Sequence, residues 1–292
     1  MGERIGVVGL GRMGWALASR MAAKDQSVSG WTRSGVDADA AKASGFVPFS
    51  DLEELVAASD ILVLSLFDDA AVREVLGQLS GFELTRKLVV ETSTVSPKIV
   101  RSMEAQISAR GGALIDAPLS GGPEMVLAGT IGIFVGGDTA SVARFLPVSS
   151  ILSDKVDHVG PLGAGAAAKI VNNMVLAGMW EALSEAVEIG GRLGLPLETM
   201  LTFLEKSPAA APAFKVRLPV IRGETDAVGF AVNGVVKDIG VMLSAATDAG
   251  LPVPAMHGIS ERFARVAQAN LSERDLAVVV PFSFDSSLPQ DE

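Results

Sequence analysis

The chain contains no cysteine, and this absence excludes several kinds of chemistry. Its 292 residues include only two histidines, His158 and His257. Without cysteine there is no disulfide framework, no thiolate nucleophile and no thiolate metal site. Neither histidine has a second histidine at ligand spacing, so we expect both to be structural and no metal to be bound. Redox chemistry would have to come from a bound organic cofactor.

Basic residues are also in the minority. The chain carries 24 lysines and arginines against 34 aspartates and glutamates, a formal net charge of −10 at pH 7. The acidic excess is shared equally between residues 1–161 and 162–292, so neither half has the basic surplus of a nucleic-acid-binding protein. We expect no nucleic-acid partner.

A long uninterrupted apolar run is missing too. The longest apolar stretch, residues 164–180, contains one lysine and two asparagines, which argues against a membrane span. The first residues run directly into a strand pattern without the features of a signal peptide. We therefore expect a cytoplasmic protein with no membrane partner.

In the first half, short β-branched runs alternate with amphipathic segments, which is typical of a parallel sheet with crossover helices. The expected strands are Arg4–Val8, Ser27–Trp31, Ile61–Ser65, Lys87–Glu91, Ala113–Pro118, Gly132–Gly136 and Asp157–Val159. The expected helices are Gly14–Lys24, Ala38–Ala43, Asp51–Ala58, Asp69–Leu79 and Pro97–Ala109. We predict a doubly wound α/β domain over residues 1–161.

Near residue 160 the strand patterns stop and periodic apolar segments take over. We predict an all-α second domain, residues 162–292, that begins with a long interdomain helix over Ala164–Leu193 and ends in a frayed tail, Ser283–Glu292. Further helices are expected at Leu197–Glu205, Ala213–Gly223, Gly234–Ala249, Ala255–Ala269 and Asp275–Val279. The long helix has more apolar surface than a small domain covers, so we expect a homodimer or homotetramer.

A G-x-G-x-x-G pattern lies between the first expected strand and the first expected helix. It reads Gly9-Leu10-Gly11-Arg12-Met13-Gly14. Gly9 permits a tight turn, Gly11 lets a pyrophosphate approach the backbone, and Gly14 lets helix and strand pack closely. This context indicates a Rossmann dinucleotide-binding domain, with a glycine-rich turn without ligand as the alternative.

The end of the second expected strand distinguishes NAD from NADP. An acidic residue there binds ribose hydroxyls, whereas a basic residue suits a 2′-phosphate. The segment reads Thr32-Arg33-Ser34, with no acid in place. A guanidinium is well matched to a phosphate, so we predict a phosphate clamp and an NADP(H) preference. The alternatives are a surface arginine and use of NAD(H).

Four segments together resemble the β-hydroxyacid dehydrogenases, a family that includes 3-hydroxyisobutyrate dehydrogenase and several semialdehyde reductases. They are the G-L-G-x-M-G opening, residues 116–122 (DAPLSGG), residues 163–173 (GAGAAAKIVNN) and Lys237-Asp238. The resemblance covers nearly the whole chain. It implies an NAD(P)-dependent oxidoreductase of class 1.1.1.- that interconverts a small anionic 3-hydroxy acid and its semialdehyde by hydride transfer.

The resemblance also implies roles for single residues. Lys169 matches the family's catalytic lysine, a general acid/base, and Asn173 lies four positions on, on the same helical face. Ser120, Gly121 and Gly122 match the family's substrate loop, where a hydroxyl and backbone amides can hold a carboxylate. The alternatives are a lysine snorkelling from an apolar helix and an ordinary glycine turn.

Two further residues match family positions. Thr94 lies in a Ser/Thr loop that in the family borders nicotinamide and substrate, and a helix cap by Ser96 is compatible with that role. Lys237 matches a lysine that reaches the cofactor from the helical domain. Its alternative is a solvated lysine or one linked to Asp238.

Departures from the family pattern keep other functions open. After the substrate loop, Pro123–Val126 form a bulkier and more acidic rim than the family usually has, which puts substrate size in doubt. Asn172 stands where 6-phosphogluconate dehydrogenase has histidine and argues against that enzyme. An imine or other carbonyl reductase of the superfamily and a catalytically silent NADP-binding module remain, although Lys169 argues against the silent module.

Overall fold

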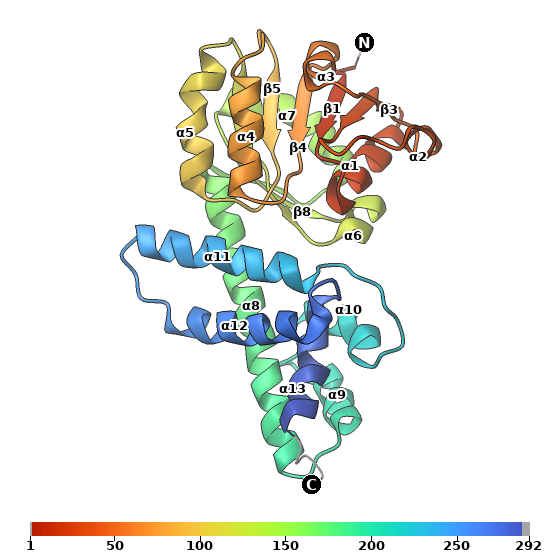
Figure 1. Cartoon of the computed structure of the whole chain (residues 1–292), viewed down its shortest axis with the longest axis vertical. Helices are drawn as coiled ribbons and strands as arrows, with labels where there is room; N and C mark the ends of the chain where they lie inside the picture. Colours follow the sequence, from red (N-terminus) through yellow and green to blue (C-terminus); the bar gives the residue numbers. More distant parts are fainter. Residues whose placement is uncertain (1, 288–292) are drawn as a thin grey trace. The chain divides into compact units, whose positions relative to one another are not determined.

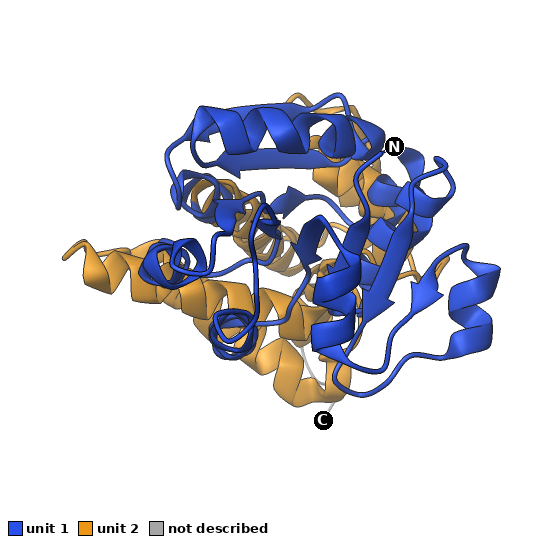
Figure 2. Ribbon diagram, turned by 90° about the horizontal axis from the view of Figure 1, so that it is seen from above, with its two compact units in different colours: residues 1–170 blue, residues 171–292 orange. Residues whose placement is uncertain are grey.

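The computed structural model describes residues 2–287. They form two compact units that divide within helix α8 (Ala164–Arg192), between residues 170 and 171 (Figure 2). The domain boundary near residue 161 stays a prediction. No helix in the described part of the chain is both long and apolar enough to cross a membrane.

The first unit is built on one nine-stranded sheet (Figure 1). Its strands are β1 (Ile5–Val8), β2 (Val28–Trp31), β3 (Val47–Pro48), β4 (Ile61–Leu64), β5 (Leu88–Glu91), β6 (Ala113–Asp116), β7 (Leu119–Ser120), β8 (Gly132–Gly136) and β9 (Val156–Gly160). The order is β3-β2-β1-β4-β5-β6-β8-β7, and β9 pairs with β8. The first six strands run parallel in the order of a doubly wound dinucleotide-binding sheet, whereas β8 is antiparallel to β6.

This sheet confirms the predicted Rossmann fold. The expected strand Ala113–Pro118 is wrong at its end, because β6 stops at Asp116 and the chain turns into the two-residue strand β7. Strand β3 was not predicted, since a two-residue strand leaves no alternating pattern to detect.

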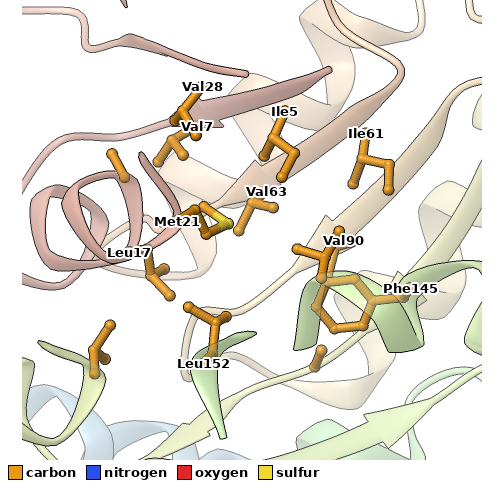
Figure 3. Packing of buried hydrophobic residues seen from close by; sticks show 14 of the residues in the cluster. Ile5, Val7, Leu17, Met21, Val28, Ile61, Val63, Val90, Phe145 and Leu152 are labelled. Carbon is orange, nitrogen blue, oxygen red and sulfur yellow. The ribbon is translucent and has the colours of Figure 1, made fainter. Parts of the chain in front are cut away.

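Both faces of the sheet are covered. All four residues of β1, β4 and β5 are buried. Alternate residues face opposite sides, as strand geometry requires. On one side Ile5, Val7, Ile61, Val63 and Val90 pack with Leu17, Met21, Phe145 and Leu152 in one apolar cluster (Figure 3).

The helices of the first unit are α1 (Arg12–Ala22), α2 (Ala38–Ala43), α3 (Leu52–Ala58), α4 (Asp69–Leu79), α5 (Pro97–Ser108), α6 (Pro123–Ala128) and α7 (Thr139–Leu152). Side-chain oxygens of Asp37, Asp51, Asp68 and Ser96 accept N–H groups at the starts of α2, α3, α4 and α5. Helices α6 and α7 were not predicted from the sequence. Helix α6 has only six residues, and α7 contains Pro147, a residue that is normally unfavourable inside a helix.

The second unit is helical, as predicted. It comprises the rest of α8, then α9 (Leu197–Lys206), α10 (Pro212–Ile221), α11 (Val232–Asp248), α12 (Pro254–Val266), a π-helical turn (Ala267–Leu271), a 3-10 turn (Leu276–Val278) and α13 (Val279–Ser287). The predicted fraying from Ser283 is wrong up to Ser287. Ser283 is 1% exposed and accepts a hydrogen bond from Arg262 at 2.9 Å, which anchors α13. Residues 288–292 of that predicted tail lie outside the described residues.

Candidate functional site

The glycine loop between β1 and α1 has the geometry that a pyrophosphate requires. Gly9 has a φ of 95°, and a Cβ there would lie 2.3 Å from the backbone oxygen of Ser65. A Cβ on Gly14 would lie 1.9 Å from the oxygen of Gly9, so only glycine lets the helix start this close to the strand. Gly11, in contrast, borders open space. The loop leaves room for an anion against its backbone.

The start of α1 favours the same ligand. The N-cap residue of α1 is Gly11, which has no side chain to accept a hydrogen bond from the helix. Among the described residues, the first turn of α1 contains no acidic side chain. The N–H groups and the positive end of the helix dipole are therefore not neutralised from within the helix. Leu10 and Met13 pack against the core cluster, and Arg12 is exposed. The residues present thus fit the pyrophosphate of a nicotinamide dinucleotide.

The predicted phosphate clamp follows β2. The N–H of Gly35 donates to the carbonyl of Thr32 at 3.0 Å, so residues 32–35, which include Ser34, form a turn. The Arg33 side chain is 78% exposed and pairs with Glu74 of α4, with 3.1 Å between Nη1 and Oε2. Because this turn follows the carboxyl end of β2, Arg33 lies at the edge where the ribose of a dinucleotide binds. The structure adds one feature to the prediction, a carboxylate that competes for the guanidinium.

The loop after β5 is tied to the segment after β4. The hydroxyl oxygen of Ser93 accepts from the N–H of Leu66 at 2.8 Å, and the N–H of Ser96 donates to Asp69 at 3.0 Å. Ser96 also caps α5. Thr94 lies between these two anchored residues and is half-buried. Its backbone is therefore held at the carboxyl edge of the parallel strands.

The predicted substrate loop follows β6. Ser120 is half-buried in β7, and Gly121 has a φ of 142°, a conformation that side chains with a Cβ rarely adopt. A Cβ on Gly122 would lie 2.4 Å from the Oε2 atom of Glu124, so this carboxylate covers the glycine backbone. The acidic rim expected from the sequence therefore lies directly against the loop. It opposes the binding of an anionic substrate unless Glu124 moves.

Lys169 lies on α8 and is only 8% exposed. A buried ammonium is costly, and structures retain one only where it has partners or a function. The first turn of the same helix is capped by Asp116, whose oxygens accept from the N–H groups of Gly163 at 2.7 Å and Ala166 at 2.6 Å. Burial raises the pKa of Asp116, against the opposing effect of these two hydrogen bonds.

In the second unit, α8 and α11 share a buried polar cluster. The side-chain amide of Asn173 donates to Asp238 at 2.7 Å, and its oxygen accepts from Asn172 at 2.9 Å. The other oxygen of Asp238 forms an ion pair with Lys237. Asn173 and Asp238 are both 3% exposed. The predicted residues Asn173 and Lys237 are therefore joined through one carboxylate.

Two buried carboxylates, Asp116 and Asp238, were not predicted to be functional. Asp116 belongs to the DAPLSGG segment, of which only later residues were assigned functions. Asp238 was considered only as the alternative partner of Lys237, and the structure contains that ion pair. A buried acid is costly unless it accepts several hydrogen bonds, so both positions need partners. For Asp116 those partners lie 47 and 50 residues away, a separation that no local spacing shows.

The sheet order and the glycine loop define the class: a dehydrogenase fold that binds NAD(P). Comparison with known proteins agrees. Residues 4–160 match the family described as "NAD binding domain of 6-phosphogluconate dehydrogenase". Residues 163–282 match "NAD-binding of NADP-dependent 3-hydroxyisobutyrate dehydrogenase".

Full-length relatives show the same relationship. The chain is 31% identical to 2-(hydroxymethyl)glutarate dehydrogenase of Eubacterium barkeri, over 95% of this chain and 93% of that protein. It is 29% identical to 2-hydroxy-3-oxopropionate reductase of Escherichia coli, over 95% and 96%. The solved structure of 3-hydroxyisobutyrate dehydrogenase from Mycobacterium tuberculosis with L-serine is similar at 28% identity and a TM-score of 0.85, covering 97% of this chain and 99% of that one.

The chain belongs to the β-hydroxyacid dehydrogenase family and is an NAD(P)-dependent dehydrogenase acting on hydroxy acids.

Proposed function

We propose that this enzyme interconverts a small 3-hydroxy acid and the corresponding semialdehyde, with NADP(H) preferred over NAD(H) and Lys169 as the general acid/base. The observation that carries the proposal is the burial of Lys169 in an alanine-rich stretch of α8, where a surface lysine has no place. The names of two relatives given above refer to carboxylate-bearing alcohols or aldehydes, which supports the same substrate class for this enzyme.

In the reductive direction the nicotinamide supplies the hydride that the carbonyl carbon accepts. The Nζ atom of Lys169 donates a proton to the carbonyl oxygen, so that the product is the neutral alcohol, and in oxidation it takes the same proton back. Asn173 is held by Asp238 and Asn172, so its amide has one orientation available for the substrate hydroxyl.

The remaining residues bind and orient. The hydroxyl of Ser120 and the backbone N–H groups of Gly121 and Gly122 hold the substrate carboxylate, and Thr94 borders the nicotinamide. Arg33 binds the 2′-phosphate, with the hydroxyls of Thr32 and Ser34 beside it. Lys237, fixed by Asp238, contributes a second positive charge to cofactor binding.

We further propose that the enzyme is a homodimer or homotetramer. Four apolar residues on α8 or directly after it are each at least 62% exposed: Val171, Val175, Ile189 and Leu193. An apolar face of this length is typical of surfaces that a second subunit covers.

A steady-state assay tests the central proposal. NADPH-dependent reduction of glyoxylate, succinic semialdehyde and tartronate semialdehyde is measured with the native enzyme, and NADP-dependent oxidation of 3-hydroxyisobutyrate in the reverse direction. We expect Lys169→Ala to lower kcat by a factor on the order of 10² while NADPH affinity is kept. Lys206→Ala, an exposed lysine on α9, is the control. NADPH binding without turnover of any of these compounds would contradict the assignment, as would full activity of Lys169→Ala.

A further inference from the structure

The first turn of α8 has no capping side chain of its own. Its N-cap residue is Gly163, and the next three residues are Ala164, Gly165 and Ala166. Alanine and glycine carry no side-chain oxygen that could accept the free N–H groups at a helix start. A helix of 29 residues therefore begins in a sequence that offers nothing to hold its end.

Asp116, at the carboxyl end of β6, supplies the missing cap. One carboxylate oxygen accepts from the N–H of Gly163 at 2.7 Å and the other from the N–H of Ala166 at 2.6 Å. These are the N-cap and N3 positions, the same two donors that a capping box satisfies from within a helix. Here one side chain, 1% exposed and distant in sequence, satisfies both.

The same turn is packed directly against the sheet. A Cβ on Gly165 would lie 2.4 Å from the backbone oxygen of Phe134 in β8, and a Cβ on Gly136 would lie 2.7 Å from the nitrogen of Gly165. From the other side, the Arg101 side chain of α5 donates from Nε to the carbonyl of Leu162 at 3.1 Å. The start of α8 is thus fixed to β6, β8 and α5, all within the first unit.

Lys169 lies three residues, less than one turn, beyond Ala166. The bond from Cα to Cβ in a helix tilts toward the N-terminus, so the lysine side chain leans toward the capped turn. Any rotation or shift of that turn relative to the sheet moves the Nζ atom by a similar amount. Misplacement of a catalytic group by about 1 Å can cost on the order of 10²-fold in rate.

We propose that Asp116 is a positioning residue for catalysis, which fixes the start of α8 on the sheet and thereby sets the position of Lys169. The inference rests on the proposed role of Lys169. A carboxylate suits this task because it has two acceptor oxygens and no hydrogen. An asparagine of the same shape offers one acceptor oxygen and points an N–H group at an N–H group.

The test compares Asp116→Asn with Asp138→Ala. Asp138 also accepts two backbone N–H groups, those of Ala140 and Ser141 at 3.0 Å each, at the start of α7. Both of these groups donate to the one oxygen Oδ1, which an asparagine would keep, so alanine is used at this position. Each substitution then removes the cap of a helix. The readouts are the thermal midpoint, the Kd for NADPH, and kcat and KM for the best substrate of the assay above. Each kcat is calculated from the concentration of NADPH-binding sites, so that unfolded protein does not lower the value.

We expect both variants to lose thermal stability, whereas only Asp116→Asn loses kcat, by about 10-fold to 100-fold, with Kd for NADPH and KM changed less than about threefold. Equal kcat per site in the two variants overturns the proposal. If Asp116→Asn does not fold, Arg101→Gln is tested instead, because it removes the hydrogen bond from the exposed Arg101 side chain to the carbonyl of Leu162. A severalfold loss of kcat at unchanged KM then supports the proposal, and an unchanged kcat overturns it.

Lys169→Ala separates this inference from the proposed function. Loss of activity in Lys169→Ala together with native kcat in Asp116→Asn refutes only the positioning role. Native activity in Lys169→Ala refutes the function assigned to the lysine, and the positioning role falls with it.

Discussion

Asn173 donates a hydrogen bond from its side-chain amide to the buried carboxylate of Asp238, with 2.7 Å between Nδ2 and Oδ2. The other carboxylate oxygen pairs with Lys237. One side chain thus holds two of the residues that the family resemblance marks as functional, and it determines which direction each of them faces.

Replacing that carboxylate should cost both stability and activity. In Asp238→Ala, the ammonium of Lys237 and the amide of Asn173 lose their acceptor, so we expect the free energy of unfolding to fall by about 3 kcal/mol. Turnover should fall by about 10-fold or more, because Asn173 is no longer fixed. Urea unfolding and kcat per NADPH site measure the two effects. Asp285→Ala, which removes an exposed aspartate on α13, should leave both nearly unchanged.

Cofactor preference should depend on the pair formed by Arg33 and Glu74. Arg33→Ala removes the proposed phosphate clamp, so the Kd for NADPH should rise by about 10-fold while the Kd for NADH stays the same. Glu74→Gln frees the guanidinium from its carboxylate, and NADPH should then bind a fewfold more tightly, since exposed ion pairs are weak. Fluorescence titration with both cofactors gives the ratios.

Arg73→Ala is the matched control, because it removes an exposed arginine adjacent to Glu74 on α4. A Kd for NADPH that rises equally in Arg73→Ala and Arg33→Ala would indicate a general charge effect and remove the case for a clamp.

The parallel strands were predictable because their signal is local. Runs such as Ile61–Leu64 are apolar throughout, since both faces of the sheet are covered. The ends of β1, β2, β4 and β5 were placed within one residue, whereas β6 ends two residues earlier than predicted and β3 was missed. The bounds of α4 were predicted as observed, because Asp68 provides a cap and Leu79 closes an amphipathic pattern. The glycine loop was predictable for the same reason, as three glycines at fixed spacing between two recognisable elements.

Features that depend on distant partners could not be predicted in this way. Ser283 appeared to belong to a polar tail, but it is buried because Arg262 donates to it from α12. The capping role of Asp116 depends on N–H groups 47 and 50 residues away. In α7, the proline at position 147 and the lack of a distinct polar face hid a regular helix. Each of these features arises from packing, which the spacing of residues along the chain does not encode.

The acidic rim should limit the affinity for anionic substrates. The carboxylate of Glu124 covers the backbone of Gly122, where the substrate carboxylate is proposed to bind. Glu124→Gln removes the negative charge at nearly constant volume, so KM for succinic semialdehyde should fall by about threefold to 10-fold, while kcat changes little. A neutral aldehyde such as butanal serves as the control substrate, and its KM should not respond. An equal change for both substrates would show that the side chain acts through its shape.

Stability should depend on pH through Asp60. Hydrogen bonds from the Arg4 guanidinium lower the pKa of Asp60 from 3.8 to about 2. A carboxyl with a lowered pKa stabilises the folded state above its unfolded pKa, and this contribution is lost as the pH falls through the folded value. Because the pair is partly exposed, we expect Asp60→Asn to cost about 1 kcal/mol at pH 7, less than the full shift implies.

The cost should shrink from about pH 4, where the unfolded carboxyl begins to take up its proton, and most of it should be lost by about pH 2, where the folded carboxyl is half protonated. Urea unfolding of the native protein and of Asp60→Asn across this range measures the difference directly. Asp154→Asn, at an exposed position, should track the native protein at every pH. A difference between Asp60→Asn and the native protein that persists unchanged at pH 2 would mean that the side chain stabilises the fold through its neutral hydrogen bonds, because most of the contribution from the charge is lost by that pH.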